Sequence, residues 1–138
     1  MTSPTPLRVA IAVGSVLGGI IHLRLYLDTY RDVPIENLGR SFVLNAVASF
    51  AAAVIVVVVS TRWAALVPLA VANATLIGFG LSRTDRGVFG FTERGWTPSP
   101  EAALSVAVEI ATAALCVGAL ILELRSSTPP EASGPTAR

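Results

Sequence analysis

The sequence predicts an all-α integral membrane protein, folded as an antiparallel bundle of four transmembrane helices. The 138-residue chain is 53% hydrophobic and only 14% charged, which is too apolar for an ordinary soluble domain. Its apolar segments carry hydrophobic residues on nearly all sides, whereas a helix of a soluble protein turns a polar face to water. Four of these segments also reach the roughly 17 to 25 residues that a helix needs to cross the hydrocarbon core.

The four predicted helices are Val9 to Leu27, Ser41 to Val59, Trp63 to Leu81 and Glu101 to Leu124. The connection between the second and third leaves room only for a tight turn, which makes these neighbours antiparallel. Residues 1–8 then form a short N-terminal tail. Residues 125–138 are rich in Pro, Ser, Thr and Ala and poor in apolar residues, a composition typical of a disordered tail.

Four crossings place the N and C termini on the same side of the membrane. All ten basic residues are arginines, which suggests a GC-rich bacterial coding sequence, and we therefore expect a bacterial cell membrane. More arginines fall on the side of the two longer loops than on the side of the termini. The two counts become equal if Arg24 and Arg40, which lie at helix ends, are left out. The positive-inside rule therefore leaves the orientation open.

Composition also argues against several functions. A net charge of +1 provides no basic stripe for nucleic acid. The chain has one His, one Met and one Cys, too few for a zinc cage or a two-histidine haem site in one copy. No arrangement typical of a nucleophilic catalytic triad is evident. We therefore expect no metal, no cofactor and no catalytic residue, and a protein that is not an enzyme.

One strongly polar residue per predicted helix falls in the same half of the bilayer. His22 lies near the end of the first helix, Asn45 near the start of the second, Asn73 in the second half of the third, and Glu109 eight residues into the fourth. An ionisable group at the bilayer centre costs about 2.5 to 3.5 kcal/mol on insertion scales. Such residues are therefore the best candidates for a functional site.

Helical spacing indicates that these polar groups face the bundle interior. Gly14, Gly18, His22 and Tyr26 recur every four residues, a small-residue groove that favours close helix packing. Ser105 precedes Glu109 by four residues in a similar stripe of small and polar residues on the fourth helix. We expect supporting contacts to the cluster from Tyr26, Arg24, Arg40 and Ser105.

The longest connection carries aromatic residues separated by glycines. Phe89, Phe91 and Trp96 alternate there with Gly87, Gly90 and Gly95. Aromatic side chains at headgroup depth are typical of interfacial anchors. Because the loop and the polar cluster share one side of the membrane, the same residues are also candidates for a lid over the cluster.

Several interpretations of the cluster remain open. Its polar groups can be structural, each interhelical hydrogen bond contributing about 0.6 kcal/mol. They can instead line a one-sided polar pocket for a lipid-like or quinone-like amphipathic molecule, or a face that packs against a second copy or another membrane protein. Two further alternatives are a proton-coupled transporter of small solutes, using His22 and Glu109 as a proton-exchanging pair, and a subunit of a membrane oxidoreductase.

Two segments carry a resemblance to a known group. The first runs from Gly18-Gly19-Ile20-Ile21-His22-Leu23 through Tyr26, Tyr30, Val33-Pro34, Leu38-Gly39 and Phe42 to Leu44-Asn45-Ala46, and the second comprises Gly87 to Glu93, Pro98 and Glu109. Together they resemble uncharacterised small four-helix membrane proteins of actinobacteria. The resemblance covers most of the chain and implies the topology, with no catalytic residue. In helix number and size alone, the chain is similar to DoxX-like membrane proteins.

Overall fold

The computed structural model describes residues 5–61 and 63–126. In this part of the chain it has four α-helices and no strand longer than an isolated bridge, as predicted. The helices are α1 (Thr5–Leu25), α2 (Leu38–Val58), α3 (Leu66–Ser82) and α4 (Glu101–Arg125), and a short π-helix, η1 (Tyr26–Tyr30), extends α1.

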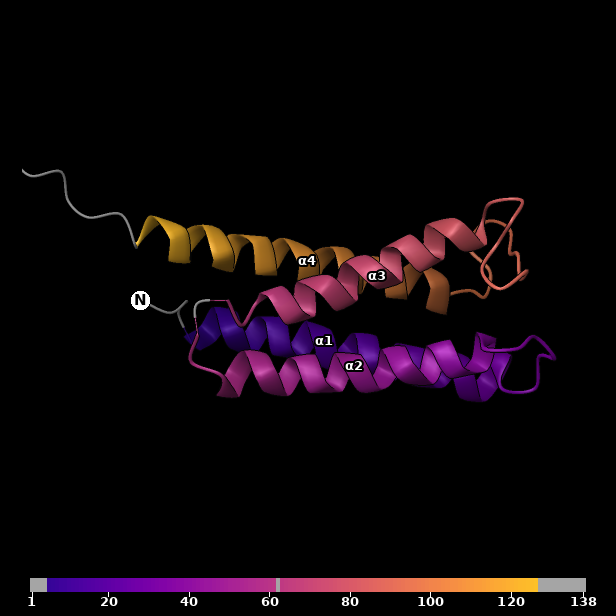
Figure 1. The fold of residues 1–138 in the computed structure, drawn as a ribbon, viewed down its shortest axis with the longest axis horizontal. Coiled ribbons are helices and arrows are strands. Elements are labelled where there is room, and N and C mark those ends of the chain that lie inside the picture. Colours follow the sequence, from indigo (N-terminus) through magenta and orange to yellow (C-terminus); the bar gives the residue numbers. More distant parts are fainter. Residues whose placement is uncertain (1–4, 62, 127–138) are drawn as a thin grey trace, which may run out of the picture.

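The helices form an antiparallel bundle made of two pairs (Figure 1). Helix α1 packs along α2 and also contacts α4, whereas α3 packs mainly on α4 and less on α2. The first turn of α1 and the last turn of α4 lie at one end of the bundle, which we call the terminal end. The connection between α1 and α2 and the connection between α3 and α4 lie at the other, the loop end (Figure 1).

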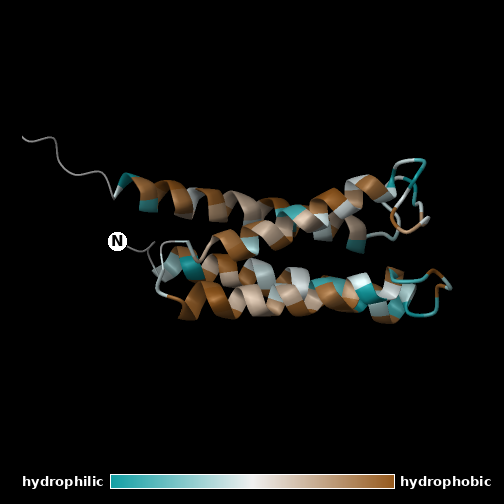
Figure 2. Cartoon of the chain, viewed as in Figure 1, coloured by the Kyte–Doolittle hydropathy of each residue, from teal (hydrophilic) through white to brown (hydrophobic). Residues whose placement is uncertain are grey.

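Hydrophobic residues cover most of the helix surfaces, while polar residues gather in the loops and at the helix ends (Figure 2). Among the described residues, three helical segments are long and apolar enough to cross a membrane: Thr5–Tyr30, Leu38–Val58 and Glu101–Arg125. Helix α3 is equally apolar but has only 17 residues. The predicted third helix therefore began too early, since Trp63 lies in the turn before α3.

Other predicted boundaries also shift. Helix α1 begins at Thr5, inside the predicted N-terminal tail. The apolar pattern already starts at Leu7, so the helix extends further toward the N-terminus than predicted. Helix α4 ends at Arg125, one residue beyond the prediction. The rest of the predicted C-terminal tail, residues 127–138, lies outside the described residues.

Small residues let α1 and α4 approach closely. A Cβ atom built on Gly14 would lie 2.3 Å from Oγ1 of Thr112, and one built on Gly18 would lie 2.6 Å from Oε1 of Glu109. Both distances are too short for any other residue to fit without movement. The predicted glycine groove therefore exists and receives the polar stripe of α4, in the manner of small-residue packing between membrane helices.

The terminal end is closed by an apolar core and one arginine. Ile11, Val56 and Cys116 are fully buried there. The guanidinium of Arg8 donates hydrogen bonds to the carbonyl oxygens of Val56, at 2.6 Å, and Val59. Carbonyls in the last turn of a helix have no partner within it, so Arg8 caps α2 from a neighbouring helix.

At the loop end, the π-helix changes the direction of one aromatic side chain. The amide of Arg31 donates to the carbonyl of Tyr26 at 2.8 Å, the five-residue spacing of a π-turn. This wider turn brings Tyr30 back toward the face of α1 that carries His22. Tyr30 is buried, with 3% of its surface exposed.

Candidate functional site

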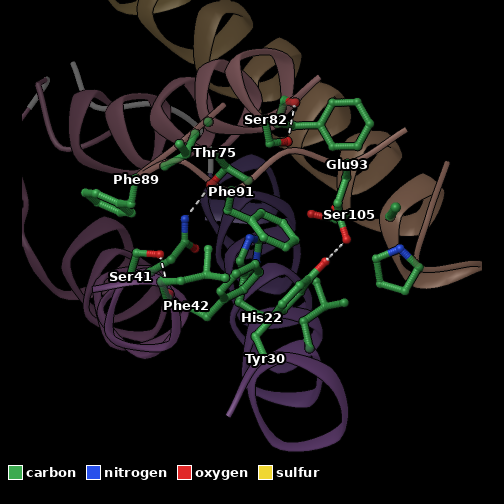
Figure 3. A pocket seen from close by; sticks show the side chains of 18 of the residues that line it. His22, Tyr30, Ser41, Phe42, Thr75, Ser82, Phe89, Phe91, Glu93 and Ser105 are labelled. Atoms are coloured by element: carbon green, nitrogen blue, oxygen red, sulfur yellow. Dashed lines mark hydrogen bonds between the residues drawn. The ribbon is translucent and has the colours of Figure 1, made fainter. Parts of the chain in front are cut away.

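A cavity of about 260 Å³ lies between the two helix pairs at the loop end (Figure 3). All four helices, η1 and the loop between α3 and α4 contribute to its walls. Most of the lining is apolar or aromatic, with a few polar groups directed inward. The lining residues are His22, Leu25, Tyr30, Leu38, Ser41, Phe42, Asn45, Ala74, Thr75, Gly78, Phe79, Ser82, Arg83, Val88, Phe89, Phe91, Glu93, Pro98, Ala102 and Ser105.

The inner part of the cavity is polar. His22 is buried, and its Nδ1 lies 2.9 Å from the carbonyl oxygen of Gly18. A carbonyl only accepts, so this contact requires Nδ1 to carry the proton and leaves Nε2 of a neutral imidazole as an acceptor. Across the cavity, Asn45 donates to Oγ1 of Thr75 at 2.6 Å, which links α2 to α3. Ser105, also buried, completes this group from α4.

The loop between α3 and α4 covers the end of the cavity and is fastened by Arg83. Its guanidinium donates to the carbonyl oxygens of Gly95, at 3.1 Å, and Thr97, at 2.9 Å. It also lies 3.5 Å from Oε2 of Glu93 and 3.6 Å from the ring centre of Phe79. One half-buried cation thus ties the end of α3 to three points of the loop.

A second connection joins the loop to η1. The hydroxyl of Tyr30 donates to Oε1 of Glu93 at 2.5 Å, as Figure 3 shows. The ring of Tyr30 is stacked on Phe42 at 4.3 Å and meets Phe91 edge-on at 5.6 Å. We call Tyr30, Arg83 and Glu93 the latch, because these residues join the loop to both helix pairs.

The loop folds back through a tight turn at its tip. Val88 and Phe91 exchange backbone hydrogen bonds of 2.9 and 2.8 Å, and this turn directs Phe91 toward the cavity. Gly87 precedes it with φ of +64°, and a Cβ atom there would lie 2.0 Å from the carbonyl oxygen of Phe91. Only glycine fits that position. The turn therefore depends on Gly87. The pattern of aromatic residues in the sequence did not predict this role.

The cavity is open at its side, between α2 and α3. Phe89 and Ala74 line it and are exposed, and Ser41 and Asn45 are partly exposed on the facing side. Figure 3 shows Phe89 on the same side of the cavity as Ser41 and Thr75. These two helices also have the weakest contact among neighbouring helices of the bundle, so the opening lies at the outer surface of the bundle between them.

Glu109 is buried between α4 and α1, with 3% of its surface exposed. It does not line the cavity: it lies one helical turn below Ser105, against Gly18, which lies one turn below His22. Within the described part of the chain its Oε1 has no hydrogen-bond partner. No hydrogen bond or ion pair joins it to His22, so the predicted pair shares a region but is not in direct contact.

Four predicted members lie elsewhere. Asn73 is exposed on the outer face of α3 and donates to the carbonyl of Leu69 at 3.0 Å, so Thr75 takes its predicted place. Tyr26 and Arg40 line a separate groove between η1 and α2. Tyr26 lies there because four-residue spacing drifts around a helix of 3.6 residues per turn. Arg24 is exposed.

Of the three predicted loop aromatics, Phe89 and Phe91 line the cavity. Trp96 does not, and with 56% of its surface exposed it packs 5.5 Å from Phe79. Its place at the rim fits an interfacial anchor better than a lid.

Sequence reasoning missed the latch. Arg83 and Glu93 are charged residues close to an apolar helix, and such residues are usually solvated. Tyr30 lies eight residues beyond His22, about 80° around a regular α-helix, and the wider π-turn reduces this angle. A tyrosine and two opposite charges that flank an aromatic loop are a pattern from which the latch could have been suspected. The pattern could be interpreted only once the structure showed the π-turn.

The described residues contain no group of three or more His, Cys, Asp or Glu side chains that could hold a metal ion. No family model, curated protein or solved structure matches the chain. The arrangement can therefore be interpreted only by its own chemistry. It offers an apolar, aromatic space with a few hydrogen-bonding groups at its inner end, a combination typical of small-molecule sites.

Proposed function

We propose that this protein is a multi-pass membrane protein that holds the head of a neutral amphipathic molecule in the cavity, with the tail leaving between α2 and α3. The observation that carries the proposal is the cavity itself, apolar at its walls, polar at its inner end and open at its side. A ligand with one polar end and one apolar tail satisfies both regions at once. Binding of this kind needs no catalytic residue.

The charges around the cavity favour a neutral head group. Besides His22, which is neutral in the tautomer described above, the lining contains one basic and one acidic residue, Arg83 and Glu93, and these lie 3.5 Å apart. A phosphodiester would bring a charge that finds no uncommitted cation among the lining residues. Carbonyl and hydroxyl groups suit the inner end better, because Asn45, Ser105 and His22 offer both donors and acceptors.

The size of the cavity favours a single ring or a comparably small head. Sites for drug-sized ligands typically measure about 300 to 1,000 Å³, and this cavity of about 260 Å³ falls just below that range. Phe42, Phe79, Phe89 and Phe91 line it and provide faces on which a flat ring can stack. A quinone-like ring or the glycerol end of a neutral lipid meets these requirements.

The proposal includes a placement in the membrane. We place α3 across the bilayer with the other three helices, the two termini on the same side and the cavity in the half of the membrane that carries the loops. A bacterial cell membrane, and a relation to the small four-helix proteins of actinobacteria that the sequence resembles, are parts of the same proposal. The antiparallel order of the helices supports the placement of the termini.

The two tryptophans provide a test, because they lie at opposite ends of the bundle. Trp63→Phe keeps Trp96 near the cavity, and Trp96→Phe keeps Trp63 at the terminal end. With the protein in nanodiscs, a short-chain quinone should quench Trp96 fluorescence saturably and Trp63 only weakly. Equal and unsaturable quenching of both would indicate simple partitioning into lipid and would contradict the proposal.

Filling the cavity gives a matched control. In the part of the chain that the structure describes, no atom lies within 4 Å of a Cβ atom built on Gly78, which lines the cavity, or on Gly118, which does not. Gly78→Leu should therefore place a side chain in the cavity and weaken binding by about tenfold or more, whereas Gly118→Leu should leave it unchanged. Mass spectrometry of neutral lipids that co-purify with the two variants extends the comparison to ligands other than quinones.

A second candidate, proton-coupled transport, rests on Glu109. Its Oε1 has no partner among the described residues, although a buried carboxylate in a membrane helix is costly to keep. Its position one turn below the cavity would let a solute and a proton occupy adjacent places. Vesicles containing wild-type protein should then show solute-dependent acidification that Glu109→Gln abolishes, and identical traces from the two proteins would dismiss this candidate.

A further inference from the structure

The outer face of α3 carries a regular stripe of residues that the described part of the chain leaves exposed. The stripe consists of Leu66, Ala70, Asn73, Ile77 and Gly80, and all five residues are exposed. Their spacing of four, three, four and three residues marks one continuous face of a helix. The outward faces of α2 and α4 have the same spacing, but among the described helices only that of α3 carries a polar residue far from the helix ends. The stripe extends from the first residue of α3 almost to its last.

Asn73 lies at the middle of this stripe with unused hydrogen-bonding capacity. A side-chain amide has two N–H donors and an oxygen that accepts twice. The only hydrogen bond recorded for this side chain among the described residues uses one donor, directed to the carbonyl of Leu69. Hydrocarbon offers no partner for the remaining groups, so an amide facing lipid at mid-helix favours an arrangement that brings a partner to it.

We propose that α3 is the interface of a parallel homodimer, in which the stripe packs on the same stripe of a second copy. Two chains inserted in the same orientation and related by a two-fold axis along the membrane normal place their Asn73 amides at the same depth. An amide is self-complementary, since each oxygen can accept from the other copy's free N–H. That property identifies the occupant as a second copy, because a different protein would need a polar group at a matching depth.

The shape of the stripe supports close packing. Ala70 and Gly80 flank Asn73 on the same face, and small residues allow membrane helices to approach closely. Among the described residues, no atom lies within 4 Å of a Cβ atom built on Gly80. Nothing in the described chain therefore fills the space beside Gly80, whereas Gly14 and Gly18 face side chains of α4.

The length of α3 is a second, independent observation. Its 17 residues span about 25 Å at 1.5 Å per residue, less than the hydrocarbon thickness of about 30 Å. Short membrane helices relieve such a mismatch by thinning the bilayer or by associating. The other three helices have 21 to 25 residues, so the helix with the greatest mismatch is also the one that carries the stripe.

The interface is separate from the ligand cavity. Thr75, Gly78 and Ser82 line the cavity from α3, and at 3.6 residues per turn they lie on roughly the opposite face from Asn73. Ala74, at the cavity mouth, lies about 100° around the helix from Asn73, so the stripe passes beside the mouth and contains no residue that lines the cavity. The inference rests on the proposed membrane placement but not on ligand binding, so the two can fail separately.

Disulfide cross-linking in liposomes tests the interface by its periodicity. In a Cys116→Ala background, single cysteines at Ala70 and Ile77, on the stripe, should cross-link rapidly on oxidation. Val67 and Ala74 are also exposed but lie off the stripe, and cysteines there should cross-link at least several-fold more slowly. Equal rates at all four positions would overturn the proposal.

The amide is tested by dilution of labelled protein in lipid. Interhelical polar contacts in membranes contribute about 0.6 to 1.7 kcal/mol, so Asn73→Leu should weaken dimerisation by about 3-fold to 20-fold, and Asn73→Gln should restore most of it. Asn73 is exposed, so neither change should unfold the bundle. Wild-type protein that stays monomeric at high protein-to-lipid ratio, or an unchanged dissociation constant in Asn73→Leu, would refute the interface. Saturable quenching of Trp96 by quinone should persist in Asn73→Leu, since the cavity is untouched.

Discussion

Removal of a single hydroxyl group, by Tyr30→Phe, tests whether the latch holds the loop over the cavity. The hydroxyl donates to Oε1 of Glu93 at 2.5 Å, while the ring packs on Phe42 and Phe91. Phenylalanine keeps the ring and its contacts. The substitution therefore removes the hydrogen bond between η1 and the loop and leaves the aromatic packing in place.

The expected magnitude follows from the surroundings of that hydrogen bond. Tyr30 has only 3% of its surface exposed, and the Glu93 side chain has 14%, so water replaces the lost partner poorly. A hydrogen bond to a charged group contributes about 1.5 to 3 kcal/mol. Because about 1.4 kcal/mol corresponds to a factor of ten, the equilibrium for loop opening should rise by about 10-fold to 150-fold. Arg83 still pairs with Glu93, which places the result toward the lower end.

Amide hydrogen exchange in nanodiscs measures this equilibrium directly. The amide of Glu93 donates to the carbonyl of Ser82 at 2.8 Å, a bond that opening of the loop must break, so its exchange should accelerate by the same factor. Tyr26→Phe is the matched control, because Tyr26 lies in the groove outside the cavity. Equal exchange rates at Glu93 in the two variants would refute the latch.

Three further substitutions test other contacts. Gly14→Ala should cost about 1 to 3 kcal/mol, because its Cβ would lie 2.3 Å from Oγ1 and 3.3 Å from Cβ of Thr112, a short side chain with little room to move; the detergent melting temperature should fall, whereas Gly118→Ala, with no described atom within 4 Å of its Cβ, should leave it unchanged or higher. Gly87→Ala should disrupt the loop tip and accelerate amide exchange there more than Gly90→Ala, since both have positive φ but only the first meets the backbone; equal effects would mean that strain alone matters. Asn45→Val should weaken the link between α2 and α3 by about 0.6 to 1.7 kcal/mol, measured in a double-mutant cycle with its threonine partner, and a coupling energy of zero would rule out the link.

The packing faces could be predicted where small residues repeat regularly. Gly14 and Gly18 face α4, and Ser105 and Glu109 are buried on the stripe that receives them. Asn73 shows the limit of this reasoning. Its depth in the membrane was predicted from its position in the sequence, but depth does not determine which way a side chain points around the helix. The amide faces outward, and a threonine two residues later faces the cavity.

Composition and periodicity by themselves determined the membrane-type helical bundle, because long apolar segments must satisfy their backbone hydrogen bonds internally and helices do so. They also indicated that the stripes of small residues on the first and fourth helices face the bundle interior. Only the tertiary structure decided where the cavity lies and how it closes. The latch joins Tyr30 to Glu93 across 63 positions of sequence, through a π-turn that rotates the tyrosine inward. Contacts of this kind depend on the relative rotation and spacing of whole helices, which no local pattern of residues specifies.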